Sequence, residues 1–263
     1  MLMPAIALAL YLAACVLLWR TATGAHPHAR GWVPVAVLAV LFHAETHVEA
    51  WRLLQGPDMH FFAALSLVGL GMAALTTAYG ATGRMPALGL VVFPLAALAL
   101  LAYALYGHAD AVSRLDWRLQ LHAWLALLAY AALALAAVLA VFLWAQERAL
   151  RRRRLSHWLA ALPPLTELET LLFRTIAVGF VLLTATLLTG VLFVHDLLAQ
   201  HLVHKTVLSV LSWLAFGALL LGRWRRGWRG ATAVRWTLAA MALLVLAFFG
   251  SKFVLELVLR RPG

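Results

Sequence analysis

Residues 119–145 read LQLHAWLALLAYAALALAAVLAVFLWA, an apolar run without a charged side chain. A helix needs about 20 mostly apolar residues to cross the hydrocarbon core of a bilayer, and this run is longer than that. Similar runs recur on both sides of it, so the sequence predicts an all-α polytopic membrane protein, a bundle of about eight transmembrane helices. The expected segments are 4–19, 32–54, 60–80, 86–106, 119–145, 170–194, 203–221 and 234–258.

The composition of the whole chain supports a membrane protein. Its 263 residues are 65% hydrophobic, which is far above the value for ordinary soluble domains. The formal net charge is +11, but the arginines stand in short loops between apolar runs, where charge sets the orientation of helices. We therefore expect membrane lipid as a partner and no nucleic acid. The single cysteine, Cys15, excludes an intrachain disulfide and a Cys-x-x-Cys-His site for covalent haem.

Two arginine-rich loops determine the expected orientation. Residues 146–170 and 222–233 are short and basic, and the positive-inside rule assigns both to the cytoplasm. Alternation then places both termini on the outer side of the membrane. We expect a single transmembrane domain over residues 1–263 with a basic cytoplasmic loop at 146–170. Within that loop, Pro163-Pro164 and the capping-box pattern Thr166-Glu-Leu-Glu169 predict the start of the sixth segment.

The histidines divide unevenly between the two sides of the expected bundle. Those on the inner side are His26, His28 and His157. Those in the outer half or at the outer surface are His43, His47, His60, His108, His122, His195, His201 and His204. Because titratable groups inside a helical bundle are costly, a cluster of them at one depth predicts a functional site.

The second segment contains two histidines and two glutamates. His43 and His47 are four residues apart and share a helix face, while Glu45 and Glu49 share a different one. One interpretation is a metal site with histidines at positions i and i+4. The other is that only His43 lies deep, while the remaining three groups lie in the wet outer interface. We favour the second interpretation for those three and a functional role for His43.

His122 lies about one turn inside the outer end of the fifth segment. Trp117, Trp124 and Tyr130 accompany it, and Arg114 and Arg118 lie just outside it. A neutral imidazole is a strong ligand for haem iron, and haem also needs apolar walls and cations for its propionates. The sequence offers all three at one depth. A hydrogen bond from His122 to another helix explains a lone histidine here equally well.

The hairpin between the sixth and seventh segments contributes further polar groups. It reads FVHDLLAQHLVHK over residues 193–205. His195 and Asp196 lie at the outer mouth, and His204 with Lys205 comes directly before the apolar stretch TVLSVLSWLAF of the seventh segment. A bis-histidine haem needs two imidazoles from different helices, and His122 with His204 or His195 meets that need at matching depth.

Several stretches carry a resemblance to a known family. They are LHAWLALLAYAAL (121–133), LPPLTELETLLFR (162–174), LLTATLLTGVLF (182–193), HKTVLSVLSWLAF (204–216), GRWRRGWRG (222–230) and FFGSKFVLEL (248–257). Together they resemble the cytochrome c assembly family of membrane proteins (CcsA-like), in its inner-membrane YpjD-type branch, which is related to HemX-type proteins.

This resemblance implies a protein that handles haem b at its periplasmic face. His122, followed by Ala129-Tyr130-Ala131, matches the place of an outer-face haem ligand in the synthase members of the family. Those members also present haem on a tryptophan-rich segment, and the corresponding residues 195–209 contain no tryptophan. We therefore expect haem handling or support of cytochrome c biogenesis, alongside other biogenesis proteins, rather than catalysis.

The proposed haem ligands are His122, His204, His195 and His43. The candidates for pairing with propionates are Arg118, Arg52 and Lys205. No catalytic residue and no metal beyond haem iron are predicted.

Two alternatives come from other classes of protein. A divalent-cation or small-molecule transporter would use the outer polar groups, which are His43, Glu45, His47, His195 and Asp196. A non-catalytic membrane scaffold would use its histidines only to pair helices.

Overall fold

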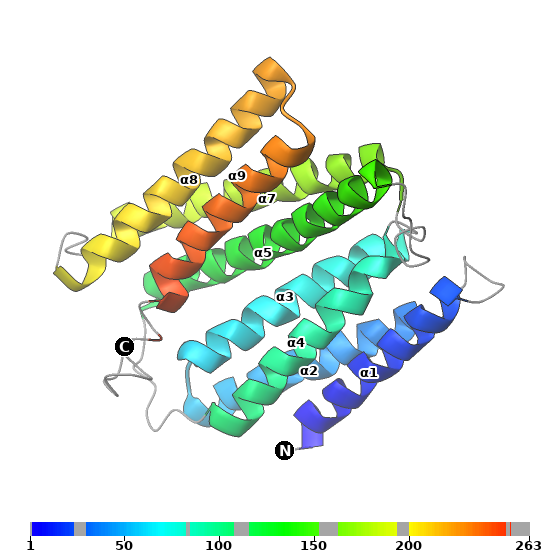
Figure 1. The fold of residues 1–263 in the computed structure, drawn as a ribbon. Helices are drawn as coiled ribbons and strands as arrows, with labels where there is room; N and C mark the ends of the chain where they lie inside the picture. The colour runs from blue at the N-terminus through cyan, green and yellow to red at the C-terminus, as the bar shows by residue number, and fades with distance from the viewer. Residues whose placement is uncertain are drawn as a thin grey trace. The chain divides into compact units, whose positions relative to one another are not determined.

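The computed structural model describes residues 2–23, 30–82, 85–107, 116–152, 163–193, 200–250 and 253. Within these ranges the regular structure is entirely helical, without a β-strand (Figure 1). Eight of the described helices are long and apolar enough to cross a bilayer. A helix satisfies its backbone polar groups internally, as hydrocarbon requires. The prediction of an all-α, multi-pass membrane protein is confirmed.

The helices follow the predicted segments closely. The first four are α1 (Leu2–Thr23), α2 (Trp32–Leu54), α3 (Phe61–Ala81) and α4 (Gly89–Tyr106), the last preceded by a 3-10 turn at Pro86–Leu88. The others are α5 (Trp117–Arg151), α7 (Leu165–Phe193), α8 (Gln200–Arg226) and α9 (Gly230–Val245), which continues as a π-helical turn at Leu246–Gly250.

The chain divides into two compact units. The first unit contains α1 to α4, in which α1 packs against α2 and α4, and α3 packs against α4. The second unit contains α5, α7, α8 and α9, in which α5 packs along α7 and α9, and α8 packs along α9. The expectation of a single transmembrane domain stays a prediction.

Helical structure enters the loop predicted at 146–170 from both sides. At one side α5 continues to Arg151, whose guanidinium lies 2.9 Å from Glu147 one turn earlier, a spacing that supports an exposed helix end. At the other side α7 begins at Leu165, directly after Pro163 and Pro164. Residues 153–162 lie outside the described part of the chain.

The predicted capping box is wrong. Thr166 lies inside the first turn of α7 rather than before it, because the helix begins directly after the two prolines. The backbone carbonyl of Thr166 accepts a hydrogen bond from Thr170. Glu169 binds outside its own helix instead: it accepts the backbone N–H of Gly230 at 2.9 Å.

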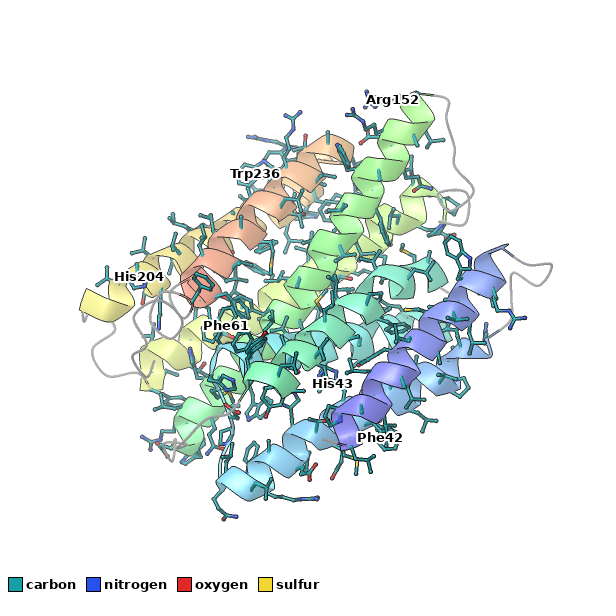
Figure 2. The ribbon with its side chains drawn as sticks, turned by 60° about the horizontal axis from the view of Figure 1, so that its bottom comes forward. Phe42, His43, Phe61, Arg152, His204 and Trp236 are labelled. Carbon is teal, nitrogen blue, oxygen red and sulfur yellow. The ribbon has the colours of Figure 1, made fainter. Side chains whose placement is uncertain are left out.

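A chain of polar contacts runs through the first unit. The Tyr11 hydroxyl lies 3.1 Å from Nδ1 of His43, whose Nε2 lies 2.9 Å from the hydroxyl of Ser66. The same hydroxyl lies 2.9 Å from Nε2 of His47. A hydroxyl has one proton, so Ser66 donates to one imidazole and accepts from the other. The contacts join α1, α2 and α3 around His43, which is fully buried (Figure 2).

The contacts extend to α4 and the turn before α3. The imidazole of His47 stacks on the ring of Tyr103 at 4.7 Å, and the Tyr103 hydroxyl donates to Asp58 at 3.4 Å. Asp58 also accepts from the ring and the backbone N–H of His60. Burial tends to raise the pKa of Asp58, but the hydrogen bonds and charge of His60, with the Tyr103 hydroxyl, hold it below its usual value.

We call this set the His43 network; its members are Tyr11, His43, His47, Asp58, His60, Ser66 and Tyr103. His47 belongs to it and is half-buried, and the expectation that it lies in the wet outer interface stays a prediction. Glu49, by contrast, is exposed, and Glu45 pairs with Arg52 at 3.3 Å on the surface of α2.

Replacement of Ser66 by alanine tests the network. We expect Ser66→Ala to destabilise the protein by about 1–3 kcal/mol, because the Nε2 atoms of two imidazoles lose their partner in an apolar environment. Thermal unfolding in detergent measures the change. The control is Thr46→Val on the neighbouring helix α2, where the lost hydroxyl bonds only to the carbonyl of Phe42 in its own helix. Equal melting temperatures for the two variants would contradict the role given to Ser66.

Candidate functional site

The second unit contains a cavity of about 250 Å³ beside His122. Four segments contribute to its walls: α5, α7, α8 and the end of α9 with the π-helical turn. The lining residues are His122, Ala126, Tyr130, Leu183, Thr186, Leu187, Gly190, Val191, Lys205, Thr206, Ser209, Val210, Leu244, Ala247 and Phe248. Most of these side chains are apolar, so the few polar groups define what the cavity is able to bind.

The spacing of residues on α5 explains its part of the wall. His122, Ala126 and Tyr130 are successive fourth residues and lie on one face of the helix. The hydroxyl of Tyr130 donates to the backbone carbonyl of Leu244, just before the π-helical turn. This bond ties α5 to the turn that places Phe248 against the cavity. The histidine and tyrosine of the motif quoted above therefore serve one site.

Thr189 on α7 fixes the tautomer of His122. The Thr189 hydroxyl directs its single proton towards the carbonyls of Ala185 and Thr186, each 2.9 Å away. Its oxygen therefore accepts from His122, whose Nδ1 lies 3.2 Å away. An imidazole with its proton on Nδ1 carries a lone pair on Nε2. That nitrogen is the atom available to an iron or another metal ion.

Gly190, the residue after Thr189, gives the imidazole its space. A Cβ atom at this position would stand 3.2 Å from Cε1 of His122, which is tighter than an ordinary van der Waals contact. The Thr-Gly pair thus supplies a hydrogen-bond acceptor for Nδ1 and, beside it, the space that the imidazole ring of His122 occupies. The sequence reasoning missed both residues, although a Thr-Gly pair in an apolar run at the depth of His122 was a usable signal.

Two of the predicted basic residues belong to this unit. Lys205 lines the same cavity as His122, so the structure brings an imidazole and a cation to one space. Arg118 lies one turn before His122 and is exposed, with its guanidinium 5.6 Å from the ring of Trp117 and 5.9 Å from that of Phe193.

The other predicted site residues lie elsewhere. His204 is exposed at the beginning of α8 (Figure 2) and is not among the cavity residues. Lys205, Thr206, Ser209 and Val210 line the cavity, so His204 projects from the opposite face of the helix. His195 and Asp196 lie outside the described residues.

Two more candidates, His43 and Arg52, belong to the first unit. Both ring nitrogens of His43 are engaged, by Tyr11 and Ser66, so coordination of a metal by His43 requires the loss of one of these bonds. Arg52 is paired with Glu45. Among the described residues, no group of three or more His, Cys, Asp or Glu side chains is arranged to hold a metal ion.

The cavity fits the needs of a haem group in three respects. It has apolar walls, an imidazole with a directed lone pair and a lysine able to pair with a carboxylate.

Comparison with known proteins agrees with this chemistry. The family described as cytochrome C assembly protein matches residues 33–259. The inner membrane protein YpjD of Escherichia coli (strain K12) is 30% identical over 267 aligned positions, which cover 97% of this chain and 100% of that protein. No solved structure matches the chain.

Two more distant relatives match parts of the chain. Protein HemX of Brevibacillus brevis is 28% identical over 131 residues, covering 49% of this chain and 48% of that protein. The cytochrome c biogenesis protein CcsA of Prochlorococcus marinus (strain MIT 9515) is 32% identical over 90 residues, covering 34% of this chain and 29% of that protein. Because the family match covers most of the sequence and the similarity to YpjD covers nearly all of it, the chain belongs to the cytochrome c assembly protein family.

Proposed function

We propose that the protein binds haem in the cavity of the second unit and handles it for cytochrome c biogenesis at the periplasmic face of a bacterial inner membrane. The observation that carries the proposal is the hydrogen bond from Nδ1 of His122 to Thr189, which directs the Nε2 lone pair to a ligand. Family membership supports the same chemistry, since one relative is named a cytochrome c biogenesis protein.

Each group around the cavity has a defined task. Haem, when bound, would supply an iron that accepts a nitrogen ligand, and its porphyrin ring would carry two anionic propionates. His122 provides the nitrogen, and Thr189 and Gly190 hold its ring in one orientation. Lys205 pairs with a propionate, and Arg118 adds positive charge one turn beyond His122. The apolar walls exclude water from the iron site. The sequence has no Cys-x-x-Cys-His motif for thioether bonds, so the haem is held non-covalently, as haem b.

A histidine from the hairpin after α7 would provide a second nitrogen ligand. His204 faces away from the cavity residues of α8, which leaves His195 as the preferred candidate. This assignment and the periplasmic position of both termini rest on the distribution of charges and histidines in the sequence. The missing tryptophan-rich segment favours handling of haem over a synthase reaction.

The first prediction concerns His122 itself. Protein purified from haem-sufficient cells should show b-type bands in reduced-minus-oxidised absorption spectra, and His122→Ala should lose them because the iron loses its ligand. His204→Ala is the matched control and should keep the bands, since His204 lies on the opposite face of α8. The absence of bands in the wild type, or full bands in His122→Ala, would refute the proposal.

The second prediction concerns the partner of His122. Thr189→Val removes the acceptor for Nδ1, and loss of such an orienting bond typically weakens metal binding about 10–100-fold. Haem titration of the purified protein, followed by absorbance, measures the affinity. Thr189→Ser should restore binding because it restores the hydroxyl, and the exposed Thr170→Val on the same helix should have no effect. Unchanged affinity in Thr189→Val would show that the bond does not orient the ligand.

A further inference from the structure

Four helix ends meet at one end of the second unit. The carboxylate of Glu169 on α7 accepts the first backbone N–H of α9, at Gly230, and lies 3.8 Å from Arg223 of α8 and from Arg229. A Cβ atom on Gly230 would stand 3.1 Å from the carboxylate of Glu147, so the end of α5 lies here as well. The sharp connection between α8 and α9 therefore lies over the ends of α5 and α7 (Figure 1).

The acidic side chains at this end form ion pairs within the unit, while many of the basic side chains are exposed on its surface. Glu169 and Glu147 are mostly buried, with side chains 13% and 24% exposed, and they pair with Arg223, Arg229 and Arg151. Exposed arginines surround them, and we call this set the arginine cluster; its members are Arg148, Arg151, Arg225, Arg226 and Arg229. Arg225 and Arg226 form no ion pair with any described residue, so the cluster keeps uncompensated positive charge.

Exposed tryptophans lie among these arginines. Trp224 is 79% exposed and Trp144 is 48% exposed. Each carries an arginine over its ring: Arg225 lies 5.7 Å from the ring of Trp224 and Arg148 lies 5.5 Å from that of Trp144. Exposed tryptophan at the ends of spanning helices marks the level of the lipid headgroups. Stacking on an indole leaves the edge of a guanidinium free to donate to a phosphate.

We propose that the arginine cluster, with Trp224 and Trp144, binds the phosphate groups of anionic phospholipids. Basic residues directly beyond spanning helices attract anionic lipid. The tryptophans place these arginines at the depth of the headgroups, where the phosphates of the lipids are the nearest anions. The cluster lies apart from the cavity at His122, with which it shares no residue, so the inference does not depend on haem binding.

The test uses the full chain, purified in a neutral detergent and titrated with short-chain phosphatidylglycerol or phosphatidylcholine, with bound lipid counted by native mass spectrometry. We expect the wild type to prefer phosphatidylglycerol. The double variant Arg225→Gln/Arg226→Gln should bind it roughly 30-fold more weakly, since each of the two arginines at an anionic surface contributes on the order of 1 kcal/mol and about 1.4 kcal/mol corresponds to a tenfold factor. Both side chains are exposed and form no ion pair with a described residue, so the fold should survive, as circular dichroism would verify.

The matched control is Arg20→Gln/Arg30→Gln, which removes the same charge from exposed positions of the first unit. It should weaken binding of phosphatidylglycerol less than Arg225→Gln/Arg226→Gln does, because Arg225 belongs to the cluster that the exposed tryptophans hold at headgroup depth. Equal weakening in both double variants would show that net charge alone explains the effect, and would overturn the proposal. Unchanged binding in Arg225→Gln/Arg226→Gln would overturn it as well. Inorganic phosphate at the same concentration should not compete; full competition would indicate a site for a free anion rather than for a lipid.

Discussion

A polar side chain inside a membrane-spanning helix must find a partner within the protein, because hydrocarbon offers none. The arrangement of the first unit follows from this constraint. Four residues from three helices, Tyr11, His43, His47 and Ser66, satisfy one another through a single tyrosine hydroxyl, a single serine hydroxyl and two imidazoles. Each contact also fixes the rotation of its helix about its axis. Apolar packing alone specifies such rotations weakly, since Leu, Ala and Val faces resemble one another.

The same constraint separates two kinds of histidine in the described part of the protein, the fully buried His43 and the partly buried His122. His43 has both ring nitrogens committed, and its environment makes it a pairing residue between α1 and α3. His122 has Nδ1 directed to Thr189 and lines a cavity with its ring. The neighbouring hydroxyls therefore distinguish a structural imidazole from a candidate ligand. His43 has a hydroxyl at each ring nitrogen, whereas His122 has one at Nδ1.

Position along the helices was predictable from the sequence, but direction around a helix was less so. The apolar runs located the eight described spanning helices, although α5 and α7 extend about five residues further into the basic loop than predicted, and His122 and Lys205 line one cavity as their expected positions suggest. Depth also grouped His204 with them, yet each residue turns an α-helix by about 100°, and His204 lies on the face opposite the cavity residues of α8. The hydrogen-bond partners of His43 could not be predicted from the sequence for a related reason. Tyr11 and Ser66 are 32 and 23 residues away, and no local pattern encodes a pairing between helices.

The bond between Glu169 and Gly230 has a consequence for biosynthesis. Its two groups are 61 residues apart, and α8 lies entirely between them. During translation, the start of α9 emerges only after α7 and α8 have been made, and its first backbone N–H then meets a carboxylate that is already in place. The start of α9 therefore has a partner in a segment of the chain that is made before it. A chain that ends after α8 would still pair Glu169 with Arg223, but the carboxylate would lack its hydrogen bond from the backbone N–H of Gly230.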